Sequence, residues 1–495
     1  MMNLNTKAVG LVVLLASCTT APAPEISPPS EIAITPLVSG SLEAVKVELS
    51  FTGSASGETI LTMPDSWGPE ENLGALVHDL TVVDETGALA LPDAEGTRLT
   101  LRHTPGMRIS VSYVVEQDYA GEPEWGQQRV PGMRPVLQPA YATLIGHTFL
   151  PEISVPQDFA LRMGSGDIAG VAVSSQPLRA GGTAPRPLDQ LRDSIILIGD
   201  FRYAEREMDG LNIRTAIRGS WALPDDEIAR LTRDVLKSGG DMFGDHPFDQ
   251  YLVAINAMPA LPEGSAVIGT GLTESFFILA TPNADAENLR HTIIHELLHE
   301  WITRRMGTTD EASDTLRMWF TEGFTEYFTQ IVLLKSGEIS LEAFVDNLNG
   351  LLRNYETSPV RNLPVSELEA QIWDSYEAER LPYQRGALLA FHWDMTQRLS
   401  GGRPLSAVIS SLIGQQDGQL TDEEILDAVS GILGAPARVD IDRFIRAAET
   451  IDVSAFDWPD CIEVASQPDG RHAFAVRDGA DAEACARTVS GDQSP

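Results

Sequence analysis

Two histidines four residues apart, with a glutamate directly after the first, are the residues of this chain best suited to chemistry. The sequence His-Glu-Leu-Leu-His runs from His295 to His299, inside a stretch whose apolar spacing predicts a helix over 285–306. On a helix, positions i and i+4 share a face, so both imidazoles can bind one metal ion. Glu296 is then placed to accept a proton from a water that the metal activates. The alternative without a metal is a helix that carries two surface histidines.

A third ligand is needed, because a catalytic zinc uses three protein ligands and one open position. Glu322, near the start of a helix predicted over 321–335, can supply it. Glu326 lies one turn further on the same face and is placed to hydrogen-bond the outer nitrogen of a ligand histidine. Alternatively, Glu322 is an acid that favours a helix N-terminus and Glu326 is solvated. The predicted cofactor is one zinc ion.

The motif from His295 to Trp301, followed by the motif from Trp319 to Phe324, resembles the gluzincin aminopeptidases. These include the aminopeptidase N family and the glycyl aminopeptidase family. The resemblance implies an N-terminal β domain, a thermolysin-like catalytic domain and an α-helical region. The interval between His299 and Glu322 is longer than expected for the first family and shorter than for the second. The chain therefore resembles a divergent branch, and no PDZ-like C-terminal domain is recognisable.

The same resemblance implies a tyrosine that stabilises the oxyanion, within a Tyr-x-Lys-Gly sequence. Tyr383 matches this position, with Arg385 in place of the lysine. A phenol aimed at the scissile carbonyl oxygen would stabilise the tetrahedral intermediate. The alternative is a core tyrosine at the start of a helix, and Tyr376 is a weaker candidate for lining the same pocket.

A glycine and a glutamate before the zinc helix form the last implied site. Gly271 and Glu274 keep the Gly-x-x-Glu spacing of both families, although the residues around them differ. The resemblance implies that this strand edge binds the substrate backbone. Gly271 would let the substrate approach closely, and Glu274 would pair with a free α-amino group. Alternatively, Glu274 is an exposed acid on an edge strand.

The elements that must position these residues follow a plan of β structure first and helices later. Short alternating apolar runs separated by Gly and Pro predict a β-sandwich-like N-terminal part. The apolar run 194–199 is expected to begin the next domain. From 285 onward the apolar period is helical, with helices expected at 285–306, 321–335, 340–355, 365–399, 405–414, 421–433 and 439–450. The fold class is therefore α+β and multidomain.

Six segments are expected along the chain. They are a lipoprotein signal peptide at 1–17, a Pro-rich tether at 18–31, a β-rich domain at 32–190, a thermolysin-like zinc domain at 191–335, an α-helical region at 336–455 and a C-terminal tail at 456–495.

The signal peptide assignment depends on a short apolar run over 8–16 that stops just before Cys18. This resembles a bacterial lipobox, in which the cysteine becomes lipidated and anchors the protein. An ordinary secretory signal is the alternative. Thr19 after this cysteine lacks the aspartate that retains lipoproteins in the inner membrane, so an outer-membrane location facing the periplasm is expected. Cys461 and Cys485 remain for a disulfide, since such bonds persist outside the cytosol.

Charge excludes several kinds of partner. The chain has 35 Lys+Arg against 71 Asp+Glu, a formal net charge of −36. Nucleic acids and anionic lipid surfaces require basic faces, so neither is an expected partner. The expected partners are a peptide substrate and a membrane reached through the lipid anchor. The sequence thus predicts a membrane-anchored zinc metallopeptidase, an aminopeptidase in our interpretation. An endopeptidase on the same site and a non-catalytic zinc-binding lipoprotein remain alternatives.

Overall fold

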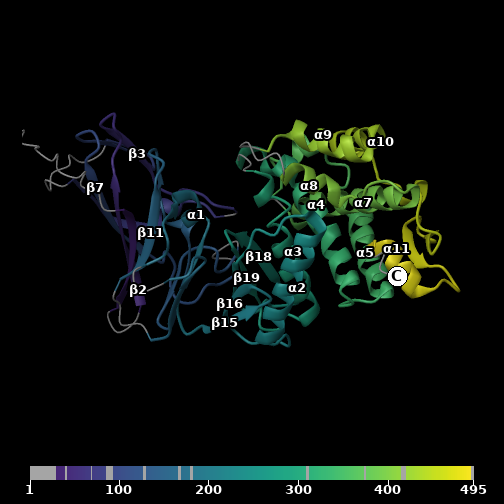
Figure 1. Ribbon diagram of the computed structural model, residues 1–495, viewed down its shortest axis with the longest axis horizontal. Coiled ribbons are helices and arrows are strands. Elements are labelled where there is room, and N and C mark those ends of the chain that lie inside the picture. Colours follow the sequence, from purple (N-terminus) through teal and green to yellow (C-terminus); the bar gives the residue numbers. More distant parts are fainter. Residues whose placement is uncertain are drawn as a thin grey trace, which may run out of the picture.

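The structure, a computed structural model, has a β-rich half and a helical half (Figure 1). It describes residues 29–38, 42–68, 70–84, 93–125, 130–164, 169–178, 182–307, 311–372, 375–413 and 420–491. The predicted signal peptide, Cys18 and most of the predicted tether lie outside the described residues. Among the residues that are described, no helix combines the length and apolar character needed to cross a membrane.

Three sheets build the β-rich half. The first has the order β13-β11-β1-β2-β7-β4, the second β10-β3-β6-β5 and the third β12-β14-β9-β8. Val45, Val47, Leu49 and Phe51 of β2 are buried in alternation with less buried neighbours, as the period-2 pattern predicts. The strands are β1 (Ser30–Val38), β2 (Leu42–Thr52), β3 (Glu58–Thr62), β4 (Val77–Asp84), β5 (Asp93–Glu95), β6 (Arg98–Arg102), β7 (Arg108–Glu116), β8 (Val136–Gln138), β9 (Tyr141–Ile145), β10 (Glu152–Ile153), β11 (Asp158–Met163), β12 (Val171–Ser174), β13 (Arg186–Pro187) and β14 (Ile195–Gly199).

The run 194–199 differs from its prediction. It forms β14, which pairs with β9 and β12 and so completes the third sheet of the β-rich half instead of beginning the next domain. All five residues of β14 are buried, because one face packs within the β-rich half and the other against the next sheet. A continuous apolar strand is expected for such two-sided burial.

A five-stranded sheet begins the helical half, in the order β15-β16-β17-β19-β18. β16, β17 and β19 are parallel, while β15 and β18 are antiparallel edge strands. Alternate residues point to opposite faces: Tyr251, Val253 and Ile255 of β17 join the helical core, whereas Leu252 and Ala254 face the third β sheet. The strands are β15 (Arg202–Met208), β16 (Leu211–Arg218), β17 (Gln250–Ala257), β18 (Val267–Leu272) and β19 (Ser275–Ala280).

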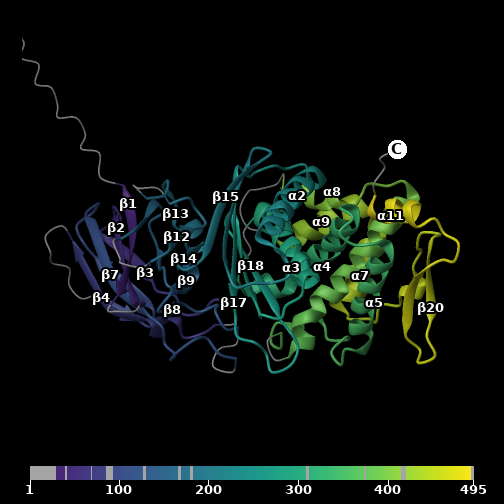
Figure 2. The ribbon, with the colours of Figure 1, turned by 90° about the horizontal axis from the view of Figure 1, so that it is seen from below.

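Helices cover the far face of this sheet and continue beyond it (Figure 2). They are α2 (Asp225–Phe243), α3 (Ala286–Leu298), α4 (Glu311–Lys335), α5 (Leu341–Thr357), α6 (Val365–Leu368), α7 (Tyr376–Ser400), α8 (Ser406–Ile413), α9 (Asp422–Leu433), α10 (Ala435–Asp440) and α11 (Ala482–Ser490). The short helix α1 (Leu188–Arg192) lies in the β-rich half, against β11 and β13.

Several helix bounds differ from the predicted ones. The helix predicted over 285–306 ends at Leu298, and the one predicted over 321–335 begins at Glu311. The stretch 365–399 forms two helices, because the Ser375 hydroxyl accepts a hydrogen bond from the Ala378 amide at 3.2 Å and so caps the start of α7. The α+β multidomain fold class is nevertheless confirmed.

The C-terminal segment is structured. The residues expected to form a tail contain the hairpin of β20 (Ile462–Ser466) and β21 (His472–Val476), followed by α11. The Asn349 amide group of α5 exchanges two hydrogen bonds with the backbone of Phe474. The predicted disulfide between Cys461 and Cys485 is present and ties the hairpin to α11.

Candidate active site

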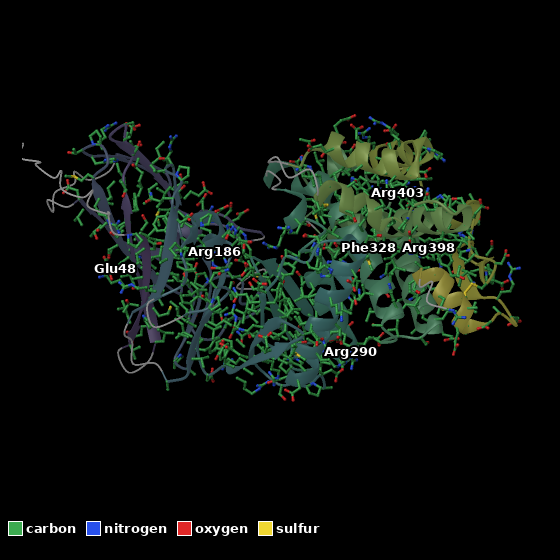
Figure 3. All side chains as sticks on the ribbon, viewed as in Figure 1. Glu48, Arg186, Arg290, Phe328, Arg398 and Arg403 are labelled. Carbon is green, nitrogen blue, oxygen red and sulfur yellow. A yellow bond between two sulfur atoms is a disulfide. The ribbon has the colours of Figure 1, made fainter. Side chains whose placement is uncertain are left out.

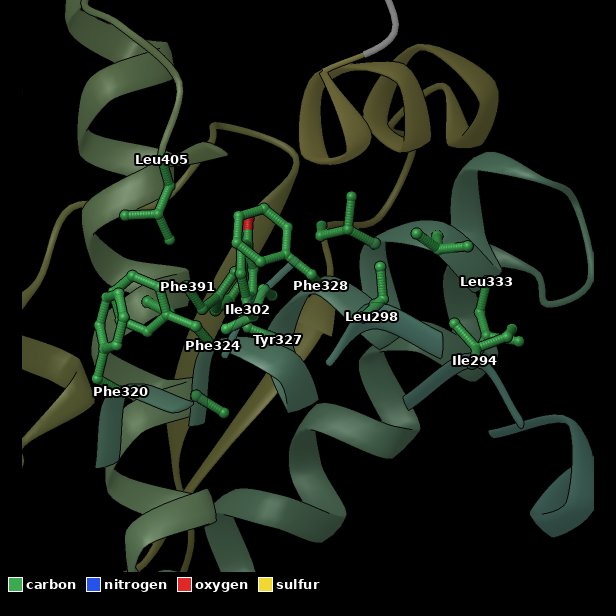
Figure 4. Close-up of a cluster of buried hydrophobic side chains, with 14 of the residues drawn as sticks. Ile294, Leu298, Ile302, Phe320, Phe324, Tyr327, Phe328, Leu333, Phe391 and Leu405 are labelled. Carbon is green, nitrogen blue, oxygen red and sulfur yellow. The ribbon is translucent and has the colours of Figure 1, made fainter. Parts of the chain in front are cut away.

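Helix α3 supplies the two histidines and the neighbouring glutamate. Asp285 caps its first turn by accepting the Asn288 amide at 2.8 Å. Its apolar face packs against α2 and α4, where Leu298 lies near Phe328 and Ile294 lies near Leu333 of α4 (Figure 4). This packing fixes the roll of the helix, so that His295 and His299, about 100° around the helix axis from Ile294 and Leu298, face Glu322 and Glu326 of α4.

The predicted ligands converge on one point. His295 Nε2 lies 3.1 Å from Glu322 Oε2, His299 Nε2 lies 3.3 Å from the same oxygen, and the two Nε2 atoms are 3.2 Å apart. Ligand atoms at 2.0–2.1 Å from a tetrahedral zinc are separated from one another by about 3.3 Å. The three donors therefore already have the spacing of one face of a zinc coordination tetrahedron.

Two glycines bring α4 and α7 into close contact beside this cluster. A Cβ on Gly386 would lie 1.8 Å from the Trp319 carbonyl oxygen, and one on Gly323 would lie 2.4 Å from the Gly386 Cα. Only glycine fits at either position. The contact brings Glu322 of α4 and Tyr383 of α7 close to one another, each beside His295 of α3.

Glu326 lies behind His295. Its Oε2 is 3.6 Å from His295 Nδ1, while its Oε1 is 3.1 Å from Nε2 of His291, one turn earlier on α3. Glu326 is therefore shared between two imidazoles. Burial raises its pKa, but His291 and His295 outweigh burial and hold that pKa well below its usual value. His291 was not identified from the sequence, although its spacing of four before His295 could have indicated it.

Glu296 is buried and projects toward the edge strand β18. A Cβ on Gly269 would lie 2.4 Å from Glu296 Oε1, so this glycine makes room for the carboxylate. Burial raises the pKa of Glu296 despite the opposing effect of His299 and His295. A raised pKa brings the carboxylate closer to the range in which it can accept and release a proton. Gly271, the glycine expected from the sequence to allow close approach of the substrate, is less crowded, since a Cβ there would meet nothing nearer than 3.5 Å.

Tyr383 lies beside α3. Its ring is stacked on that of His295, with the centroids 5.9 Å apart and the planes 17° from parallel. Burial raises the pKa of Tyr383 well above 10, and Glu322 raises it further, so the phenol keeps its proton and can donate a hydrogen bond. Arg380, which was not identified from the sequence, places its Cζ 3.9 Å from the centroid of this ring.

Glu274 is not brought to the three metal-ligand candidates by any of its described contacts. It occupies the turn between β18 and β19, with a left-handed φ of 50°. Its Oε2 accepts hydrogen bonds from the side-chain amides of Gln176 and Gln250, at 3.1 and 2.8 Å. Arg186 of the β-rich half, labelled in Figure 3, lies 3.7 Å from the other oxygen. The carboxylate is therefore held within the protein, and the amino-terminus role stays a prediction.

Arg304 lies shortly after α3 and connects this part of the chain to the edge strand β18. Its guanidinium donates to the Gly271 carbonyl and pairs with Asp193, which lies just before β14. Burial raises the pKa of Asp193, but Arg304 more than compensates, so that pKa lies below its usual value. This tie fixes β18 relative to both α3 and the β-rich half.

The residues around the cluster fit a zinc ion. His295, His299 and Glu322 form a His₂Glu donor set, which is a catalytic zinc set. The His295 Nδ1 and Glu326 Oε2 atoms are buried without a hydrogen-bond partner. Burial lowers the pKa of His295, but Glu322 and Glu326 outweigh burial and raise it to about 10. The site is thus strongly negative and favours a cation.

The part of the chain that contains this site matches a known peptidase family. Residues 288–388, which include the three ligand candidates and Tyr383, match the family of M61 glycyl aminopeptidases. No curated protein sequence is significantly similar to this chain. The resemblance to the gluzincin aminopeptidases is confirmed.

Solved structures share the fold over most of the chain. An aminopeptidase N family protein from Idiomarina loihiensis has 17% identity and a TM-score of 0.72, covering 88% of this chain and 79% of that one. An M1 zinc metallopeptidase from Deinococcus radiodurans has 18% identity and a TM-score of 0.56, with coverage of 86% and 94%. A mutant of an M1 zinc metallopeptidase from the same organism, bound to a Tyr-Ser-Ala substrate, has 17% identity and a TM-score of 0.54, with coverage of 86% and 94%.

Proposed function

We propose that this protein is a zinc-dependent aminopeptidase that hydrolyses peptides. The observation that carries the proposal is the spacing of 3.1–3.3 Å among the donor atoms of His295, His299 and Glu322. Glu296 lies next in sequence to the first ligand, in the position of a general base. A structural zinc site is closed by four protein ligands. This three-ligand set with a neighbouring base is instead suited to catalysis.

One zinc ion held by these three side chains would supply an activated water and polarise the scissile carbonyl. Glu296 would accept a proton from the attacking water at its carboxylate and deliver it to the leaving amine. Tyr383 donates its hydroxyl hydrogen to the scissile carbonyl oxygen as negative charge develops there. Glu326 holds His295 in orientation from behind.

The edge strand β18 is the proposed binding site for the substrate backbone. Among the described strands it pairs with β19 alone, and its Gly269 lies directly against Glu296. An extended peptide can add to such an edge through main-chain hydrogen bonds. The solved relative that binds Tyr-Ser-Ala supports a peptide as the substrate class.

The engagement of Glu274 by Gln176 and Gln250 favours a second candidate, an endopeptidase on the same site. An aminopeptidase must recognise a free α-amino group, whereas an endopeptidase need not. Hydrolysis of a peptide and of its N-acetylated twin separates the two. The aminopeptidase proposal requires the acetylated peptide to be resistant, and equal rates would overturn it.

Replacement of Glu296 tests the catalytic proposal. Glu296→Gln keeps the shape of the side chain but removes the base, so we expect zinc content to be unchanged and hydrolysis to fall by at least about 10²-fold. Glu287→Gln, on the exposed first turn of the same helix, is the matched control and should retain full activity. Full activity in the Glu296 variant would refute the assigned role.

We further propose that Cys18 carries a lipid anchor and that the enzyme faces the periplasm from the outer membrane. The support is the apolar run ending at this cysteine and the Pro-rich segment that follows. Cys18→Ser should abolish incorporation of labelled fatty acid and release the protein from membranes. Lipid labelling that survives the substitution would disprove the anchor.

A further inference from the structure

Arg380 lies one aromatic ring away from a candidate zinc ligand. It is on α7, one turn before Tyr383, and its Cζ is 3.9 Å from the Tyr383 ring centroid. That ring in turn stacks on His295. A guanidinium over an aromatic face is held there by cation–π attraction. Its position is therefore fixed relative to the reacting atoms that Tyr383 and zinc would contact.

The guanidinium of Arg380 has no partner among the described residues: its side chain makes neither a hydrogen bond nor an ion pair with them. Other arginines of the helical half differ: Arg304 pairs with Asp193, and Arg398 pairs with Asp394. Burial lowers the pKa of Arg380, but Tyr383 and acidic neighbours outweigh burial and raise it, so the side chain stays charged.

An arginine with free donors beside an active site is suited to a carboxylate. The planar guanidinium offers paired N–H groups that match two carboxylate oxygens. The chain as a whole carries −36 and repels anions, so an anionic substrate needs a local cation. In a dipeptide, the carboxylate carbon lies only about 4 Å from the scissile carbon, and each further residue adds roughly 3.4 Å.

We propose that Arg380 binds the C-terminal carboxylate of short peptides, so that the protein acts preferentially on dipeptides and tripeptides. The proposal rests on the peptidase function proposed above. Tyr376, one turn earlier on α7 and 70% exposed, is a neighbour of Arg380 and would offer an aromatic surface to the residue that carries this carboxylate.

The test compares a dipeptide with its C-terminal amide, which has the same residues but no terminal charge. For the wild type we expect kcat/KM for the free acid to exceed that for the amide by about 10- to 100-fold, the range of a charged hydrogen-bonded pair. Arg380→Gln should bring this ratio close to one, and Arg380→Lys should restore part of it. Arg353→Gln changes an exposed arginine of α5 that has no ion pair with the described residues, and it should leave the ratio unchanged.

Binding gives a second readout that does not depend on turnover. With zinc-loaded Glu296→Gln protein, calorimetry should show tighter binding of the free acid than of the amide, and Arg380→Gln in that background should remove the difference. A wild type that cleaves both forms equally well would overturn this inference and leave the peptidase function intact. An amide-capped dipeptide with an acidic second residue tests the other source of a carboxylate, and dependence on Arg380 for that peptide alone would also overturn the proposal. Absence of all hydrolysis would instead refute the peptidase function.

Discussion

Glu326 connects the candidate zinc ligand His295 to a residue further from the site, His291. Its two oxygens face His291 and His295, on successive turns of α3. Carboxylates behind ligand histidines fix ring orientation and raise ligand basicity. His291 in turn holds this carboxylate in place from the more exposed side. The three side chains therefore form a chain of contacts leading outward from the predicted metal.

Substitutions at these two positions are expected to weaken metal binding. Glu326→Ala should raise the zinc dissociation constant about 10- to 100-fold, because His295 loses its orienting partner. His291→Leu should weaken zinc binding in the same direction, whereas His291→Gln keeps a hydrogen-bond donor and should stay near the wild type. Chelator competition measures these constants. Unchanged affinity in Glu326→Ala would show that the carboxylate does not support the site.

For individual residues, the sequence predicted the arrangements that depend on local spacing along the chain. His295, Glu296 and His299 share one helix, so their arrangement follows from the helical period. Glu274 illustrates the limit, since its neighbours Gln176 and Gln250 come from distant segments and the turn geometry is set by strand register. The sequence could not show either that the Arg380 side chain lacks a partner among the described residues, because this depends on the folded structure.

Among the elements, the crossing of α4 and α7 determines the site. α4 carries Glu322 and α7 carries Tyr383, and the two helices touch through backbone at Gly323 and Gly386. The small residues thus control the distance between a metal ligand and the proposed oxyanion donor. The sequence contained both glycines, but only the packed structure shows that they meet.

Adding one methyl group at this crossing should strongly destabilise the protein. Gly386→Ala places a Cβ 1.8 Å from the Trp319 carbonyl oxygen, so we expect a loss of about 3 kcal/mol in unfolding free energy and strongly reduced hydrolysis. Gly350→Ala on α5 is the matched control, since its nearest neighbour would be 3.9 Å away; it should gain about 0.5–1 kcal/mol. Denaturant titration measures both, and a wild-type stability for Gly386→Ala would contradict this packing.

The contact of α7 with the segment before the hairpin should respond to pH. His392 stacks on Phe456 with ring centroids 3.7 Å apart, and burial lowers its pKa despite Asp440 and Asp457. The unfolded chain binds a proton below about pH 6.5 while the native histidine resists it, so unfolding free energy falls as pH decreases, by at most about 1.4 kcal/mol per pH unit.

His392→Phe removes this titration. Denaturant titrations between pH 7.5 and pH 5 should show a shallower pH dependence in the variant than in the wild type. Contributions of the other histidines are common to both proteins and cancel in the difference. Parallel pH profiles would mean that His392 titrates alike in the native and unfolded states.

For the whole molecule, the sequence predicted the order of β structure, mixed sheet and helices. It predicted a buried strand at 194–199 but placed it in the following domain, because a continuous apolar strand fits any sheet that is covered on both faces. It also left the C-terminal residues without elements, since short strands such as β20 and β21 carry little period of their own. Their stability comes from α5 and from the disulfide, which are distant in sequence or covalent.

The disulfide is expected to stabilise the molecule without entering its chemistry. Cys461 and Cys485 are separated by 24 residues, and closing such a loop contributes about 3 kcal/mol in the chain-entropy treatment. The double serine variant should lose about this much unfolding free energy in denaturant titration and keep its zinc content. Loss of zinc in a folded double variant would show that the C-terminal hairpin supports the site directly.

The most direct test of the central claim is incubation of the zinc-loaded wild-type protein with a broad library of peptides that have free amino termini, with the products identified by mass spectrometry. Zinc on His295, His299 and Glu322, with Glu296 as base, predicts that single amino acids are released from the amino termini and that a chelator stops the release. Intact peptides across the whole library, with zinc shown to be bound, would contradict the account and leave a zinc-binding protein without peptidase activity.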